Sequence, residues 1–191
     1  MFDKKRKEAW MEFAEEVNGE YTSASFFKTE RIRILKENYM VLLDLYAVST
    51  GKSVIFYTRF KAVYHQASDF KFKVYKRGIF SNLGKKLGMQ DINTGNGEFD
   101  EDFIVKGNDE SNIIRLFSNV KTRDLLYKIP NFTLEIKDNK EAKELCLMTP
   151  QIIKERDKLR DAFQLFCTVL DDIGNMGIVK NYEIEDEKFY K

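Results

Sequence analysis

Acidic and amide side chains gather between residues 91 and 102, where their oxygens could bind a hard cation such as Ca²⁺. Asp91, Asn93 and Asp102 stand at the first, third and last positions of a twelve-residue calcium loop. The sixth position holds Asn96, however, where the sharp turn of such a loop requires glycine. We therefore expect no metal site, and we keep five residues as candidates for an interaction or ligand loop: Asp91, Asn93, Asn96, Asp100 and Asp102.

Groups suited to acid–base catalysis near neutral pH are scarce in this chain. His65 is the one histidine, and its neighbours Gln66, Ser68 and Asp69 form no nucleophile motif such as G-x-S-x-G. The glycines match neither a phosphate-binding loop nor a dinucleotide-binding motif. The sequence therefore predicts no catalytic residue and no cofactor, and it favours a protein that is not an enzyme.

The two cysteines, Cys146 and Cys167, lie among apolar residues and lack the paired spacing of a metal site. This pattern predicts two reduced, buried thiols, as is typical of cytoplasmic proteins; a disulfide between them is the alternative. The first residues have no apolar stretch of the kind found in a secretion signal. We therefore expect a cytoplasmic protein.

Composition bounds the size of the fold and the class of partner. The 191 residues are 43% hydrophobic and 14% aromatic, enough to fold one domain, which we place at 1–179 with a charged, loosely held tail at 180–191. The net charge of +1 does not favour nucleic acid. No uncharged stretch approaches the ~20 residues of a membrane span. The basic run at Lys4, Lys5, Arg6 and Lys7 is either a solvated surface or a contact for an acidic partner.

The first half of the chain predicts one helix followed by strands. Helical spacing covers Asp3 to Asn18, and Gly19 suits the left-handed position after a helix. A period of two then predicts about five strands, joined by short turns into an antiparallel meander. These strands are 21–28, 31–34, 39–48, 53–64 and 70–76. The third is apolar on both faces except Asp44, which predicts a central strand in which Arg59 of the next strand pairs with Asp44.

The second half predicts a loop, helices and a late hairpin. Residues 79–97 are rich in glycine and predict a long ordered loop with a helical turn at 83–87. A strand at 99–106 should place Asp100 and Asp102 on its solvent side. Asn108 or Asp109 should cap a helix, and a second helix should end before Pro130. A hairpin then follows at 132–137 and 145–148, and a helix capped by Thr149 runs from 150 to 173.

Residues 95–109 read G-N-G-E-F-D-E-D-F-I-V-K-G-N-D. This segment resembles the signature F-D-x-x-F-x-V-x-G-x-D of a family of bacterial proteins known only as a domain of unknown function, and the resemblance extends over about half of the chain. It implies no activity. Many members of that family carry apolar membrane segments near the N-terminus, and this sequence has none. Strand, turn and helix-cap chemistry explains most of the motif without a ligand.

Together these patterns predict an α+β domain. A mostly antiparallel sheet of six to eight strands should be covered by the N-terminal helix, a middle helical pair and the C-terminal helix. Two functions remain open. The first is a non-catalytic module that binds an unknown protein or small ligand through the loop at 79–97. The second is a hydrolase-like enzyme with a site built from scattered carboxylates.

Overall fold

The computed structural model describes residues 2–25, 29–49, 51, 53–78 and 89–182. These residues form an α+β fold with one large antiparallel sheet, as the sequence predicts, although the sheet has ten strands instead of six to eight. The helices are α1 (Phe2–Glu16), α2 (Gly97–Asp102), α3 (Glu110–Ser118), α4 (Val120–Lys128) and α5 (Arg156–Asn175). The strands are β1 (Glu20–Thr22), β2 (Arg31–Lys36), β3 (Tyr39–Ser49), β4 (Val54–Gln66), β5 (Phe72–Lys76), β6 (Gln90–Asp91), β7 (Phe103–Gly107), β8 (Thr133–Asn139), β9 (Ala142–Thr149) and β10 (Val179–Tyr182).

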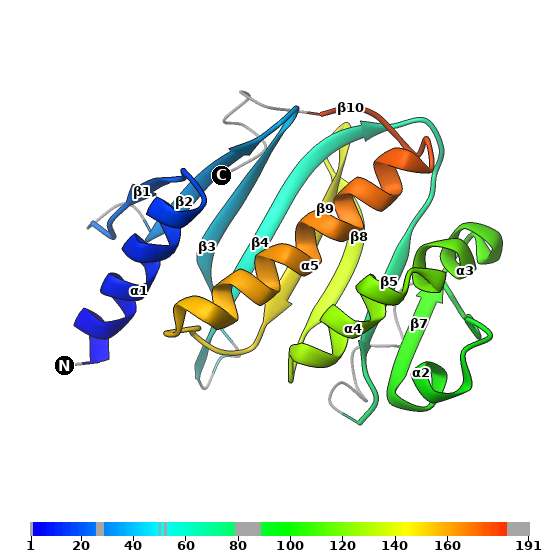
Figure 1. Ribbon diagram of the computed structural model, residues 1–191, viewed down its shortest axis with the longest axis horizontal. Coiled ribbons are helices and arrows are strands. Elements are labelled where there is room, and N and C mark those ends of the chain that lie inside the picture. The colour runs from blue at the N-terminus through cyan, green and yellow to red at the C-terminus, as the bar shows by residue number, and fades with distance from the viewer. Residues whose placement is uncertain (1, 26–28, 50, 52, 79–88, 183–191) are drawn as a thin grey trace.

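The strand order is β1-β2-β3-β4-β9-β8-β5-β7-β6, and β10 pairs with the end of β4. The first four strands form the expected meander (Figure 1). The meander then breaks, because the β8–β9 hairpin lies between β4 and β5. The predicted hairpin therefore forms at the centre of the sheet. It buries Leu134, Leu145 and Leu147 there.

The helices pack on one face of the sheet, with α5 crossing its middle between α1 and α4 (Figure 1). Strand residues that point toward the helices alternate with residues on the other face, so Val41 and Leu43 of β3 meet Phe60 of β4 in the core. From α5, Phe166 is fully buried and its ring lies 6.1 Å from that of Phe60. Helix α1 joins the same core.

Two helix boundaries differ from the predicted ones. At the end of α1, Asn18 and not Gly19 takes the left-handed conformation, with φ of 52°. Gly19 is needed for space, because a Cβ atom there would lie 2.7 Å from a methyl group of Ile32. At the other end of the chain, Thr149 belongs to β9 and pairs with Thr58, so α5 begins at Arg156 and the prediction of a helix from Pro150 is wrong.

The segment that resembles a bacterial family also differs from its predicted shape. Phe99 lies in α2, so it does not share a strand with Phe103 and Val105, although all three side chains are buried. Asp109 caps α3 as expected, with its carboxylate accepting from the amide of Asn112 at 3.0 Å. Residues 79–88 of the predicted loop at 79–97, with the predicted helical turn at 83–87, lie outside the described residues, and the described end of that loop contains β6.

Candidate functional site

Each of the five candidate residues at 91–102 takes part in local structure. Asp91 forms an ion pair with Lys106 at 2.6 Å. The Asn93 side chain accepts from the amide of Gly95, and Asn96 is the N-cap of α2. Asp102 is the last residue of α2. These contacts close a turn and start a short helix.

Asp100 holds the turn together. Its Oδ1 accepts from the amide of Thr94 at 3.0 Å and from the Thr94 hydroxyl at 2.8 Å, and its Oδ2 accepts from the amide of Gly95 at 3.1 Å. Because Asp100 and Asp102 lie in α2, the expectation that they share the solvent face of a strand is wrong. Among the described residues there is no group of three or more acidic, histidine or cysteine side chains placed to hold a metal ion.

The two thiols are buried and free, as predicted. Burial raises the pKa of Cys146 to about 12, and it raises the pKa of Cys167 to about 12 as well. Both side chains are therefore protonated at neutral pH and are poor nucleophiles. His65 lies near the end of β4, opposite Asn181 of β10.

Carboxylates on the sheet face away from the helices are each paired with a basic side chain. The predicted pair of Asp44 and Arg59 forms with two contacts of 2.8 and 2.6 Å, and the Arg59 guanidinium lies 4.2 Å from the ring centre of Tyr46. The other pairs are Glu135 with Lys73 and Glu144 with Lys137. Each of these three carboxylates is therefore engaged by a basic side chain of the same sheet.

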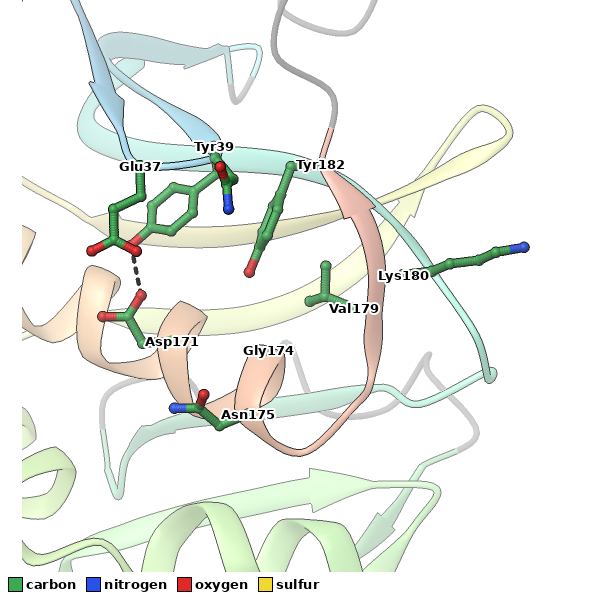
Figure 2. Close-up of a pocket in the computed structure, with 9 residues that line it drawn as sticks. Glu37, Tyr39, Asp171, Gly174, Asn175, Val179, Lys180 and Tyr182 are labelled. Atoms are coloured by element: carbon green, nitrogen blue, oxygen red, sulfur yellow. Dashed lines mark hydrogen bonds between the residues drawn. The ribbon is translucent and has the colours of Figure 1, made fainter.

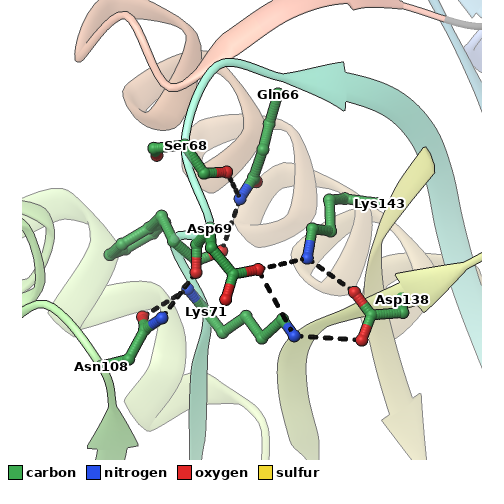
Figure 3. Close-up of polar contacts among 8 residues, drawn as sticks. Gln66, Ser68, Asp69, Lys71, Asn108, Asp138 and Lys143 are labelled. Atoms are coloured by element: carbon green, nitrogen blue, oxygen red, sulfur yellow. Dashed lines mark hydrogen bonds and ion pairs between the residues drawn. The ribbon is translucent and has the colours of Figure 1, made fainter. Parts of the chain in front are cut away.

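A second polar cluster ties the β4–β5 connection to the β8–β9 turn. Asp69 and Asp138 alternate with Lys71 and Lys143, so that each lysine contacts both carboxylates at 2.6 to 3.5 Å (Figure 3). The hydrogen bond from Lys143 is the main cause that lowers the pKa of each carboxylate. Positive and negative charges balance within this cluster, and it joins segments that are far apart in the sequence.

A pocket of about 430 Å³ lies between the β2–β3 turn, the end of α5 and β10 (Figure 2). Tyr39 donates to Asp171 at 2.8 Å, and Lys36 contacts the other oxygen of the same carboxylate at 3.2 Å. The ring of Tyr182 packs 5.0 Å from that of Tyr39. Burial raises the pKa of Tyr39. No spacing in the sequence could reveal this pocket, because its walls come from three distant segments.

The most unusual surface is the end of the β3–β4 hairpin, described at residues 45–49, 51 and 53–57, which we name the β3–β4 arm. Its neighbours stop short of it, because β2 pairs with β3 only as far as Asp44 and β9 pairs with β4 only from Thr58 (Figure 1). The arm is apolar but exposed. Its large exposed apolar side chains are Tyr46, Val54, Ile55 and Phe56. The predicted two-sided burial of this strand is therefore wrong beyond Asp44.

The arm also presents backbone groups along its β3 edge. The amide of Leu45 points away from β4, since it donates to the carbonyl of Glu30 at 3.4 Å. Alternate residues of a strand point their amide and carbonyl groups to the same side, so Ala47 and Ser49 also point outward. Within the described part of the chain, no strand pairs with them on that side. Such an edge can accept another strand.

Comparison of the chain with models of protein families, with curated proteins and with solved structures gives no match. Within the described ranges, no helix is both long and apolar enough to cross a membrane.

Proposed function

We propose that this protein is a non-catalytic interaction module that binds another protein chain through the β3–β4 arm. The exposure of apolar side chains on the arm carries this proposal: Val54 is 54% exposed and Phe56 is 47% exposed. A two-stranded hairpin by itself is only marginally stable in water. A partner chain packed on the arm would cover this apolar surface, and the open β3 edge offers backbone groups to a strand of that partner.

The distribution of polarity along the arm favours a protein partner over a membrane surface. A hairpin that inserts into lipid would carry its apolar residues at the tip. Here the sequence between β3 and β4, residues 50–53, reads Thr-Gly-Lys-Ser, and the exposed apolar side chains belong to the two strands. This arrangement is typical of strand addition, in which backbone hydrogen bonds give affinity and alternate side chains give specificity.

Three observations support binding over the enzyme alternative. The carboxylates on the open sheet face are paired with basic side chains, the candidate residues at 91–102 make local structural contacts, and both cysteine thiols are buried. We propose a cytoplasmic location, because free buried thiols suit a reducing compartment. We also propose membership of the bacterial family that residues 95–109 resemble, which assigns no activity.

The proposal is tested by placing a photoreactive phenylalanine analogue at Phe56 in cells that produce the chain. The matched control carries the same analogue at Leu35, which is 63% exposed but lies in β2, outside the arm. We expect a discrete protein adduct from position 56 and none from position 35. Equal labelling at both positions, or no adduct at position 56, would rule the arm out as the binding surface.

A further inference from the structure

We propose that the pocket between the β2–β3 turn, the end of α5 and β10 binds a small organic ammonium ion, with its positive group between the carboxylates of Glu37 and Asp171 and the ring of Tyr182. The pocket shares no lining residue with the β3–β4 arm, so this site does not depend on the function proposed for the arm. Its volume of about 430 Å³ lies within the range of roughly 300 to 1,000 Å³ that is typical of small-molecule sites.

The end of α5 concentrates negative charge beside the pocket. Asp171 and Asp172 lie close to its C-terminus, and its last turn holds no basic residue. The C-terminal end of a helix carries a partial negative charge, so carboxylates there are unfavourable unless a cation compensates them. Glu37 adds a third carboxylate from the β2–β3 turn. Lys36 contacts Asp171 at 3.2 Å, whereas Lys180 points away from the pocket (Figure 2), so negative charge is in excess here.

The Tyr182 hydroxyl experiences a field of the same sign. Burial first, and then the charges of Asp171 and Glu37, raise the pKa of this hydroxyl. A field that keeps a phenol protonated also favours an added positive charge. The hydroxyl points toward the end of α5 (Figure 2), and Gly174 leaves room for it, since a Cβ atom there would lie 3.0 Å away.

Polar side chains of the pocket walls are available to a ligand. Within the described part of the chain, no hydrogen bond or ion pair engages the side chains of Glu37 or Tyr182. The Asp171 carboxylate receives one contact on each oxygen, from Tyr39 and from Lys36, and a carboxylate has about four lone-pair sites. An ammonium group carries only donors. The pocket therefore offers the acceptors that an ammonium group requires.

Aromatic walls favour an organic cation over a metal ion. The ammonium group of Lys36 lies 5.8 Å from the ring centre of Tyr39 while it contacts Asp171, so these walls already accept one ammonium group. The ring of Tyr182, tilted by 41° against that of Tyr39, offers a further face to a cation. Calcium takes about six to eight oxygen ligands. Among the described residues, no three acidic, histidine or cysteine side chains are grouped to hold a metal.

Amide NMR spectra of the full chain, titrated with three small molecules of equal length, test this inference. The probes are diaminobutane, butanediol and succinate, which are cationic, neutral and anionic at neutral pH, and they are added at matched ionic strength. We expect saturable shifts with diaminobutane at the amides of residues 37–39 and 174–175, and none at the amides of the β3–β4 arm. Butanediol and succinate should cause no saturable shift.

Glu37→Gln should weaken the binding of diaminobutane about fivefold, which corresponds to ~1 kcal/mol, the upper end for an exposed ion pair. Glu37→Lys should abolish it. Because Glu37 is exposed in a turn, neither variant should disturb the fold. Glu15→Gln, which removes an exposed carboxylate of α1, is the matched control and should leave binding unchanged.

Three results would overturn the ammonium site. The first is the absence of saturable shifts with diaminobutane at the pocket. The second is equal binding of butanediol or succinate, which would show that the pocket does not select a positive charge. The third is an affinity of Glu37→Gln for diaminobutane equal to that of the unaltered chain.

Discussion

The pair formed by Asp44 and Arg59 is the clearest case in which single residues could be predicted from the sequence. A lone carboxylate in an apolar strand requires a partner, and Arg59 occupies the facing position on the next strand. Asp100 could not be predicted in the same way. Its role depends on the path of the turn at Thr94 and Gly95, which a twelve-residue spacing pattern does not determine.

We predict that Asp44→Ala lowers the free energy of unfolding by about 3 kcal/mol, because it leaves the largely buried Arg59 side chain without its carboxylate. Urea denaturation measures this loss. In the double variant with Arg59→Met, the loss should be smaller than in Asp44→Ala alone, since no unpaired charge remains. If Asp44→Ala lowers the free energy of unfolding by less than about 0.5 kcal/mol, water solvates the Arg59 guanidinium in place of the lost carboxylate, and the explanation is contradicted.

A second prediction concerns the cluster of Asp69, Asp138, Lys71 and Lys143. Both carboxylates have a pKa below the ordinary 3.8, chiefly because Lys143 donates to them. Their contribution to stability is therefore fully present above the pKa of the unfolded chain. It is lost as the pH falls from about 4 through the lowered values.

Lys143→Met should reduce this acid dependence in thermal melts recorded between pH 5 and pH 2. The expected difference is modest and should shrink in high salt, because Asp69 and Asp138 are largely exposed. Lys140→Met, close by in the β8–β9 turn, is the matched control for removing one positive charge. Identical pH profiles for the unaltered chain and Lys143→Met would contradict the assigned contacts.

At the scale of elements, periodicity predicted the longer strands, but it missed the short strands β6 and β10 and several segment boundaries. Phe99, Phe103 and Val105 are compatible with both a strand and a helix that leads into one, and the cap at Asn96 decides for the helix. Thr149 and Pro150 look like a helix start. Pairing of Thr149 with Thr58 in the sheet overrides that local preference.

Gly107 illustrates why β7 can pack against α3. A Cβ atom at this position would lie 2.8 Å from the backbone oxygen of Lys71 and would collide with Ile113. We predict that Gly107→Ala lowers the free energy of unfolding by roughly 1 to 3 kcal/mol, because the carbonyl cannot move without disturbing the sheet. Gly97→Ala, where the added methyl group meets open space, should change it by less than about 0.5 kcal/mol. Equal effects in chemical denaturation would contradict this explanation.

Two phenylalanines of α5 test its orientation. Phe166 is fully buried, whereas Phe163 is only partly buried at the edge of the core. Phe166→Ala should therefore lower the free energy of unfolding by about 3 to 5 kcal/mol, and Phe163→Ala should cost clearly less. Calorimetric or urea unfolding of both variants measures the difference. A larger loss for Phe163→Ala would mean that the helix is rotated about its axis.

For the whole molecule, the class of fold could be predicted but the strand order could not. Short turns fix which strands neighbour one another in the first meander. The position of the β8–β9 hairpin between β4 and β5 depends on contacts between distant segments, and no local signal in the sequence specifies it. The arm was missed for a related reason. Its apolar pattern matches that of a buried strand, and only the lengths of β2 and β9 leave it exposed.

Residue-resolved hydrogen exchange by NMR tests the central claim that the arm offers a free strand edge for binding. In dilute solution, the outward amides of Ala47 and Ser49 should exchange fast, and the amides of Tyr46 and Val48, which face β4, should exchange slowly. When a partner chain is bound at the arm, the amides of Ala47 and Ser49 should exchange as slowly as those of Tyr46 and Val48. Slow exchange at all four amides in the free protein, or fast exchange at Ala47 and Ser49 in the complex, would contradict the account.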